Sequence, residues 1–226
     1  MTKSELATWL GAGLTFLAVL VALIKEELQR LWRRPVLDVS VKTEPPDCHK
    51  SKTLYSDPKT GSVLGEGDCY YLRLWVHNKG NLPATNVQVF GSGLFQETVP
   101  NKFISVDNFL PMNLRWAHTK EILRDRIAPK MGRHCDLGHI ADPKLKHLHK
   151  ETKPGVPNDK TALFLDLEVL PFTLVHLLQP GSYKLNLIIS ADNSSPVKKV
   201  VKIMHSGNWF EDENKMFTKG IGLVLE

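Results

Sequence analysis

The sequence predicts an all-β protein, an antiparallel β-sandwich preceded by one N-terminal transmembrane α-helix. Three observations predict this: an uncharged apolar stretch over residues 6–24, a change from helical to alternating periodicity after Pro35, and many short alternating runs separated by turn residues. At 226 residues the chain has room for one ordinary domain and an additional segment. We therefore divide it into residues 1–34, a membrane helix with a basic juxtamembrane extension, and residues 35–226, the sandwich domain.

Residues 6–24 are long enough to cross a bilayer. As a helix they would span about 28 Å, close to the ~30 Å hydrocarbon core. A cleaved signal peptide and a buried core helix are the alternatives. A signal peptide is disfavoured because Lys3 is offset by Glu5, and because the apolar run continues into Lys25-Glu26-Glu27 without a small-residue cleavage site.

The basic residues on either side of this stretch predict its orientation. Lys3 precedes it, whereas Lys25, Arg30, Arg33 and Arg34 follow it. Positive residues resist translocation, so we expect an inner-membrane protein with its N-terminus outside and its C-terminal domain in the cytoplasm. The four basic residues would then lie at the membrane surface, within reach of anionic headgroups of the lipid bilayer.

The cysteines agree with a reducing compartment. Cys48, Cys69 and Cys135 form no CxxC pair, and we expect free thiols. With the reverse topology, Cys48 and Cys69 could form a disulfide bond, and Asn193 would become a glycosylation acceptor.

The predicted strands follow in order after Pro35. Turn residues such as Gln179-Pro180-Gly181-Ser182 separate them, and their lengths indicate two packed antiparallel sheets. Residues 44–68 are expected to be a loop, and residues 118–127 are the one stretch with helical character. The expected strands are residues 36–41, 70–78, 84–90, 113–118, 135–140, 161–170, 182–191, 196–205 and 220–225.

Alternation within these runs indicates which side chains form the core. Tyr183, Leu185, Leu187 and Ile189 share one strand face. At the corner after residue 77, the Asn78 side chain and the φ freedom of Gly80 suit a change of direction, and Pro83 and Ala84 would lead into the next strand. The apolar residues Leu72, Leu74 and Val76 before the corner, and Val87 and Val89 after it, are expected in the core.

Three sequence segments resemble a known family: "WVHNKG", "NLPATNVQVF" and "LQPGSYKLNLIISADN". They are similar to motifs of the Ig-like β-sandwiches of the CARDB type, found in membrane-anchored and surface proteins of prokaryotes, and the match extends loosely over residues 36–203. The resemblance implies an Ig-like binding or spacer module without an active site. Such modules are mostly extracellular, whereas the flanking charges place this one inside.

Composition gives no support for nucleic-acid binding. The net charge of +5 is modest, and the basic region over residues 114–153 lacks interleaved aromatic residues on which bases could stack. We expect no nucleic-acid partner.

One region of the sequence contains several residues of types that bind metal ions. His134, Cys135 and His139 lie in one run, and His147 and His149 follow it. Imidazole and thiolate bind zinc, but the spacing matches neither a zinc finger nor an HExxH helix. We expect no metal and no cofactor, and keep a metal-dependent enzyme using the His134/Cys135/His139 region as a second alternative.

Other residue types that could perform catalysis are placed unfavourably. In strands, neighbours such as His205 and Ser206 point to opposite faces, as do His134 and Cys135. Asp166 and Glu168 share a face but alternate with apolar residues. The glycines of residues 61–67 lack the Lys-Ser/Thr ending of a phosphate-binding loop. We therefore expect no catalytic residues.

Two segments are candidate interaction surfaces. Small residues recur along the membrane helix and would allow close helix pairing into a homo-oligomer; they are Ala7, Gly11, Thr15, Ala18 and Ala22. A non-strand segment near the C-terminus carries four large apolar residues beside acidic ones and could bind a partner; they are Trp209, Phe210, Met216 and Phe217. The alternative for the second segment is that these side chains cover the open end of the sandwich.

The sequence therefore predicts a single-pass, membrane-anchored β-sandwich that acts as a protein-binding, sensing or scaffold module and performs no catalysis. The alternative is a membrane effector, in which a ligand or partner binds the sandwich and the transmembrane helices then oligomerise.

Overall fold

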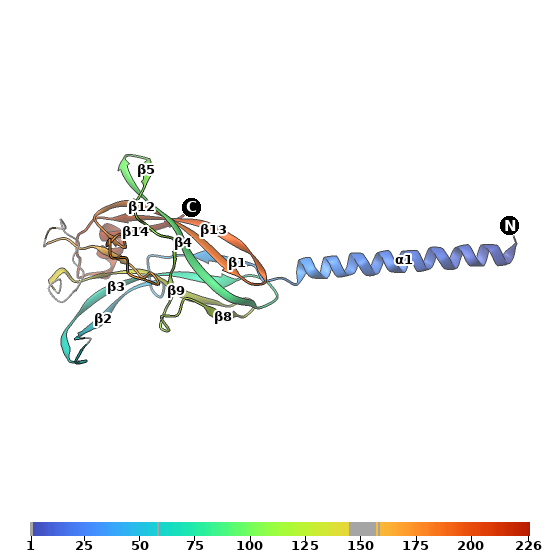
Figure 1. Cartoon of the computed structure of the whole chain (residues 1–226), viewed down its shortest axis with the longest axis horizontal. Coiled ribbons are helices and arrows are strands. Elements are labelled where there is room, and N and C mark those ends of the chain that lie inside the picture. The colour runs from blue at the N-terminus through green and yellow to red at the C-terminus, as the bar shows by residue number, and fades with distance from the viewer. Residues whose placement is uncertain (1, 58, 145–156, 158) are drawn as a thin grey trace.

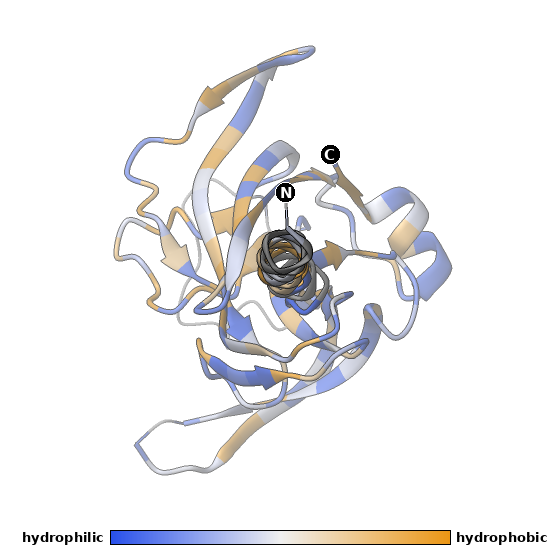
Figure 2. Ribbon diagram, turned by 90° about the vertical axis from the view of Figure 1, so that its right-hand side faces the viewer, coloured by the Kyte–Doolittle hydropathy of each residue, from blue (hydrophilic) through white to orange (hydrophobic). Residues whose placement is uncertain are grey.

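The computed structural model describes residues 2–57, 59–144, 157 and 159–226, and in the N-terminal helix it describes the side chains of residues 9 and 11–25. The helix α1, Lys3–Trp32, extends away from one end of the β-sandwich, and the N-terminus lies at its far end (Figure 1). Viewed along its axis, α1 stands over the central part of that end (Figure 2). Its 30 residues correspond to roughly 45 Å of helix.

The first sheet contains seven antiparallel strands. Its main path runs β1-β3-β9-β10-β11, with β2 paired to β3 and β7 paired to β9. The strands are β1 (Leu37–Ser40), β2 (Cys48–Ser56), β3 (Val63–Asn78), β7 (Arg115–Trp116), β9 (Gly132–Ala141), β10 (Leu163–Leu165) and β11 (Leu177–Leu178).

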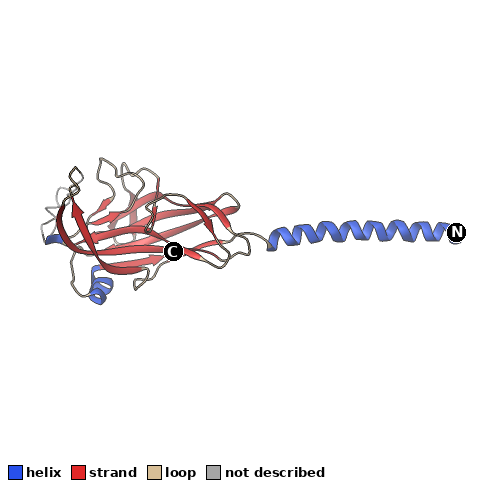
Figure 3. Ribbon diagram, turned by 90° about the horizontal axis from the view of Figure 1, so that it is seen from below, coloured by secondary structure: helices blue, strands red, loops and turns tan. Residues whose placement is uncertain are grey.

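The second sheet also contains seven antiparallel strands. Its path runs β14-β13-β12-β4-β5, and β6 and β8 both pair with β4. The strands are β4 (Ala84–Val99), β5 (Lys102–Ser105), β6 (Met112–Asn113), β8 (Arg124–Ile127), β12 (Gly181–Ala191), β13 (Ser194–His205) and β14 (Ile221–Leu225). Two short helices, α2 (Glu213–Lys215) and η2 (Met216–Gly220), lie at the end of the sandwich opposite α1 (Figure 3).

The two sheets enclose one hydrophobic core, and this confirms the predicted all-β sandwich. Strand faces that the alternation assigned to the core are buried, including Leu72 and Leu74 of β3, Val87 of β4, and Leu185 and Leu187 of β12. One-sided burial fixes the register of these strands, because a shift by one residue would turn every apolar side chain outward.

The corner between β3 and β4 is built around the buried side chain of Asn78. Its Oδ1 accepts hydrogen bonds from the backbone N–H of Val36 (3.1 Å) and Gly80 (2.9 Å), and its Nδ2 donates to the carbonyls of Leu82 (2.7 Å) and Ile127 (3.2 Å). The explanation proposed for Gly80 was wrong, since its φ is not positive. Glycine is required there because a Cβ would lie 2.2 Å from the Arg34 carbonyl oxygen.

The loop predicted at residues 44–68 was also wrong. It contains β2, which pairs with β3 from Cys48↔Leu72 to Ser56↔Val63, and the glycine-rich residues 61–67 form the end of the turn and the start of β3. Apart from Cys48, the residues of β2 are partly or fully exposed. Its polar sequence therefore has no apolar alternation that would reveal a strand.

Residues 118–127 do not form a helix. His118 and Lys120 have φ of 69° and 61°, which a right-handed helix cannot accommodate, and Arg124–Ile127 is instead strand β8. Two predicted strands are also shorter than expected: residues 113–118 are divided between β6 and β7, and only Leu163–Leu165 of residues 161–170 forms a strand.

Candidate functional site

The described part of α1 is apolar and exposed on every side. Each described side chain from Gly11 to Lys25 is exposed, and the large apolar ones retain 38% to 67% of their accessible surface; they are Leu14, Phe16, Leu17, Val19, Leu20, Val21, Leu23 and Ile24. Nothing else in the described chain covers them. Within the described residues, no helix combines enough length with enough apolar character to cross a membrane.

The small residues of the proposed pairing face lie on this exposed helix. A Cβ at Gly11 would meet no atom within 4 Å, and the Thr15 hydroxyl donates a 2.9 Å hydrogen bond to the Gly11 carbonyl. Ala18 and Ala22 are exposed, whereas the side chain of Ala7 lies outside the described residues. Pairing through this face stays a prediction.

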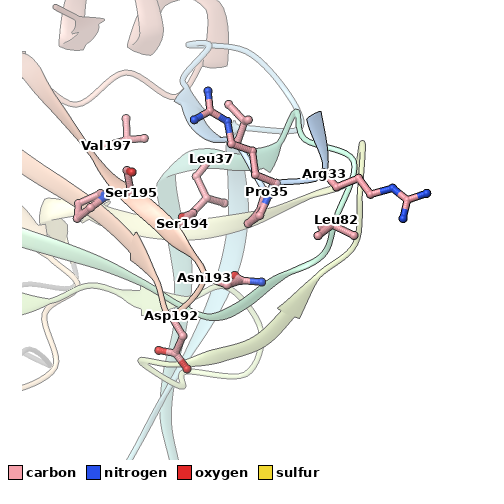
Figure 4. A pocket seen from close by; sticks show the side chains of 12 residues that line it. Arg33, Pro35, Leu37, Leu82, Asp192, Asn193, Ser194, Ser195 and Val197 are labelled. Carbon is pink, nitrogen blue, oxygen red and sulfur yellow. The ribbon is translucent and has the colours of Figure 1, made fainter. Parts of the chain in front are cut away.

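The basic residues after the apolar stretch reach the junction of α1 and the sandwich. Lys25, Arg33 and Arg34 are exposed, and the side chain of Arg30 lies outside the described residues. A cavity of about 800 Å³ opens at this junction, and we call it the junction cavity. It is lined by residues 33–37, by Leu82, and by residues 192–197, which form the β12–β13 turn and the start of β13 (Figure 4).

The C-terminal segment that carries the predicted partner residues is packed onto the end of the sandwich. Met216 and Phe217 are buried, and the Tyr70 ring lies 4.9 Å from Trp209 and 5.5 Å from Phe217, measured between ring centroids. The Tyr70 hydroxyl donates to the carbonyl of Phe210 at 2.8 Å. These positions fit the alternative reading, in which the four side chains cover the open end.

A different group of apolar side chains is exposed on the sandwich. Phe172 is fully exposed, and Val169 and Leu170 beside it retain 60% and 52% of their surface. Leu110 retains 64%, and its segment runs beside theirs, since the Glu168 N–H donates to the Asn113 carbonyl at 2.8 Å. We call Leu110, Val169, Leu170 and Phe172 the apolar edge patch.

Sequence reasoning missed this patch because residues 161–170 were assigned to one strand. The predicted strand already ended before Pro171, but β10 itself ends at Leu165 and leaves Val169 and Leu170 outside it. The patch is contributed by two segments far apart in the chain, which are brought together by the Leu114↔Leu167 bridge and by hydrogen bonds of Asn113 and Arg115 to residues 166–168.

The histidines near Cys135 are paired with carboxylates. His134 Nε2 lies 3.0 Å from Asp47 Oδ1, and His139 Nδ1 lies 3.1 Å from Asp166 Oδ1. Cys135 is buried in the core, where burial raises the pKa of its thiol well above the usual range. Among the described residues no group of three or more His, Cys, Asp or Glu side chains could hold a metal ion; His147 and His149 lie outside them.

A charged network covers the outer face of the first sheet near these histidines. The buried carboxylate of Asp136 accepts from Arg73 Nε at 2.9 Å and from Lys120 Nζ at 3.0 Å. The Arg73 guanidinium lies 5.3 Å from the Tyr71 ring centroid, and Tyr71 lies 5.7 Å from the His139 ring. Since its charged groups are paired, the network can hold the loop that carries Lys120 against the sheet. No sequence spacing predicted it, because its members come from three distant segments.

All three thiols are free and buried. Burial raises the pKa of Cys48 and of Cys69 to about 12, so neither is a reactive thiolate at neutral pH. Both side-chain groups of Asn193 are occupied, since Oδ1 accepts from the Thr85 N–H (3.1 Å) and Nδ2 donates to the Pro83 carbonyl (2.9 Å).

His205 and Ser206 do not form a catalytic pair in the described structure. His205 is buried, and its Nε2 lies 3.1 Å from the Thr161 carbonyl, whereas Ser206 is exposed. Burial lowers the pKa of His205, although bonds to the Thr161 and Gly220 backbone oppose this. His205 therefore has the environment of a core residue, and Ser206 that of an exposed neighbour in the sequence.

Comparison with known proteins adds no further information on function: no family model, no curated protein and no solved structure matches this chain.

Proposed function

We propose that this chain is a single-pass protein of a prokaryotic inner membrane, anchored by residues 6–24, whose cytoplasmic sandwich binds a protein partner and performs no catalysis. The observation that carries the proposal is the apolar helix α1, exposed on all described sides. A helix that is apolar all round requires lipid or protein around it. Lipid is the favoured surrounding because residues 6–24, taken from the sequence, match the hydrocarbon thickness.

The orientation of the anchor is supported by the charges that flank it. Lys25, Arg33 and Arg34 are exposed at the sandwich side of α1, where they can remain in water or contact headgroups. Moving them across the membrane would require removing several positive charges from water. A cytoplasmic sandwich avoids this cost.

Partner binding is supported by the apolar edge patch. A fully exposed Phe beside exposed Val and Leu side chains is unusual in an isolated domain and typical of interfaces. The resemblance of "WVHNKG" and "NLPATNVQVF" to CARDB-type Ig-like modules points to the same class of function. We therefore propose the patch as the partner-binding surface.

Extraction of membranes with alkaline carbonate tests the anchor. We expect the full chain to remain in the pellet and a variant lacking residues 1–34 to move to the supernatant. A variant in which an unrelated apolar helix replaces residues 6–24 is the matched control and should remain in the pellet. Release of the full chain by carbonate would contradict the proposal.

Site-specific photocrosslinking tests the partner surface. A photoreactive amino acid at Phe172 should give a discrete heavier product in membranes of the source cells. The same amino acid at Leu64, an exposed apolar residue in the turn region of β3, is the control and should not give that product. Identical products from both positions, or none from Phe172, would remove the patch from the proposal.

The membrane effector remains a second candidate, because the space beside Gly11 and Gly13 is open in the described chain. A second helix could approach closely there. Gly11→Leu should abolish helix pairing and function of an effector but leave a scaffold unaffected. Replacement of residues 6–24 by an unrelated apolar helix should have the same two outcomes.

A further inference from the structure

A smaller cavity than the junction cavity lies on the outer face of the second sheet. Its volume is about 350 Å³, and we call it the strand pocket. Ile188 of β12 and Val200 of β13 contribute partly buried apolar side chains to its lining. They face outward, because their sequence neighbours Leu187 and Val201 are buried in the core.

Two irregularities of the second sheet form the strand pocket. Strand β14 ends at Leu225, and the backbone of Glu226 makes the last hydrogen bonds to Val200, so that in the described sheet residues 194–199 of β13 pair only with β12. On the other side, the register between β4 and β12 shifts and leaves Ser92 without a paired residue in β12. Such bulges redirect side chains and often lie at functional sites.

The strand pocket has the size and the lining to accept an aromatic ring. An apolar cavity of about 150 Å³ is sufficient to hold benzene. Phe172 of the apolar edge patch provides such a ring, and it is fully exposed on its own chain. Its turn is ordered by a 2.9 Å hydrogen bond from the Leu174 N–H to the Pro171 carbonyl, which lowers the entropy lost when the ring is bound.

The segments that carry the apolar edge patch are acidic. Residues 107–113 and 166–174 contain three acidic residues and no Lys or Arg. Among the acidic residues, Asp107 is exposed and Glu168 is half-buried. Arg115 contacts the second segment, but its guanidinium donates to two backbone carbonyls there. The patch therefore favours a partner surface with positive charge.

The surface around the strand pocket is basic. Lys198 lines the pocket, is exposed, and forms no ion pair with any described residue. Lys184 and Lys202 lie opposite each other on the same face of β12 and β13. Glu226 is the acidic residue of the pocket lining, and it pairs with Lys184. The charges of the pocket therefore complement those of the patch.

The two surfaces also lie at the same level of the sandwich. Lys198 pairs with Ile188, Ile188 with Phe90, and Phe90 with Asn113, whose carbonyl accepts from the Glu168 N–H at 2.8 Å. Paired residues of antiparallel strands lie side by side, perpendicular to the strands. Because the long strands run along the direction of α1 (Figure 3), this row of residues keeps about the same distance from the end of the sandwich that carries α1.

We propose that Phe172 of one copy inserts into the strand pocket of a second copy, so that the sandwiches associate head to tail. Anchors in one membrane hold neighbouring copies at a common height, and at that height the patch of one copy meets the pocket of the next. A contact between two different surfaces repeats from copy to copy, and it closes a ring or extends into an open array. The inference rests on the apolar edge patch as the proposed partner surface and on the proposed anchor for the common height.

Thiol crosslinking between two differently tagged full chains, co-expressed in one membrane, tests this contact. One copy carries Thr173→Cys beside Phe172, and the other carries Ser92→Cys in the pocket lining; the native cysteines are buried. We expect a short bismaleimide to give a product that contains both tags. Thr60→Cys in the turn before β3, combined with Ser92→Cys, is the position control and should not give it.

Substitutions in the same crosslinking pair test the two surfaces. Phe172→Ala should lower the yield of the product roughly tenfold, because a central aromatic anchor carries much of the binding energy of an interface. Lys198→Glu should lower it several-fold, and adding Glu168→Lys should restore part of the yield. Lys219→Glu, at an exposed lysine near the opposite end of the sandwich, is the matched control and should leave the yield unchanged.

Three outcomes would overturn the inference: no product from Thr173→Cys with Ser92→Cys, an equal yield with Thr60→Cys, or an unchanged yield in Phe172→Ala. Replacement of residues 6–24 by an unrelated apolar helix should preserve the product, and its loss would assign the contact to the membrane helices instead. A photocrosslinked product at Phe172 that contains another protein and no second copy would overturn the inference and leave the partner surface of the proposed function intact.

Discussion

At the scale of single residues, the corner between β3 and β4 decides how α1 and the sandwich are joined. Asn78 occupies both its carbonyl oxygen and its amide nitrogen in hydrogen bonds to backbone groups of four residues. The Val36 N–H is among them, so the same side chain orders the segment that follows α1. The sequence predicted a turn residue at this position, but the four partners depend on the folded corner.

Replacing Asn78 by Ala should lower the free energy of unfolding of the sandwich by about 3–4 kcal/mol, because buried backbone groups would lose their partners. Urea unfolding of the full chain in detergent, followed by tryptophan fluorescence, measures this. Lys79→Ala, which removes an exposed lysine paired with Asp38, is the control and should cost at most about 1 kcal/mol. Equal losses for both variants would refute the role of Asn78.

Gly80→Ala should destabilise the sandwich by about 2–4 kcal/mol, because the added Cβ would meet backbone atoms of residues 34–36 at less than 3 Å. The matched substitution is Gly91→Ala, whose Cβ would lie at an ordinary 3.5 Å from its nearest neighbour, a Leu185 side-chain atom. The same unfolding measurement compares them. If Gly80→Ala left the free energy of unfolding unchanged, the corner would be able to move away from the added methyl group.

At the scale of elements, two apolar segments differ in exposure, and composition alone did not predict which of them is exposed. The segment of Trp209 and Phe217 packs on the core, whereas the loop of Leu170 and Phe172 faces solvent. In the sequence, both segments contain apolar side chains near turn residues. What separates them is the contact with Tyr70, which only the folded sandwich supplies.

Replacing these two phenylalanines by Ala should therefore change the free energy of unfolding by very different amounts. Phe217→Ala should lower the free energy of unfolding by about 3 kcal/mol, because it removes a buried ring from the core. Phe172→Ala should change it by no more than about 0.5 kcal/mol, because the ring is fully exposed. Thermal or urea unfolding of the two variants measures both changes. A large loss for Phe172→Ala would mean that the loop is packed, and would remove the apolar edge patch.

The pairing of His139 in β9 with Asp166, the residue after β10, should make stability depend on pH. Burial alone would raise the pKa of Asp166, but the His139 hydrogen bond and the charges of His139, Lys120 and Arg115 outweigh it and lower the pKa below 3.8. The unfolded chain then binds the proton more readily, so this contribution is present above about pH 4 and is lost as the pH falls through the folded-state pKa.

Asp166→Asn should accordingly flatten the decline of stability below about pH 4, measured as the unfolding midpoint against pH. Asp125→Asn, at an exposed carboxylate, should leave the shape of the curve unchanged. An unaltered acid limb in Asp166→Asn would show that the pairing with His139 does not lower this pKa in solution.

At the scale of the whole molecule, the fold class could be predicted from the sequence, whereas the surface features could not. Long alternating strands such as β12 were confirmed, because burial on one face imposes a period of two. The polar strand β2 and the short strands β5, β8 and β11 were missed, since pairing with neighbours rather than apolar alternation stabilises them. The junction cavity and the apolar edge patch could not be predicted, because each is assembled from distant segments.

Membrane insertion with a cytoplasmic sandwich is the central claim, and thiol labelling in intact cells tests it most directly. The native cysteines are buried and provide a low background. Thr2→Cys places a thiol before α1, and Thr60→Cys places one in the exposed turn before β3. With a membrane-impermeant maleimide, we predict labelling of Thr2→Cys in intact cells and of Thr60→Cys only after lysis. Labelling of Thr60→Cys in intact cells, or of neither variant before lysis, would contradict the account.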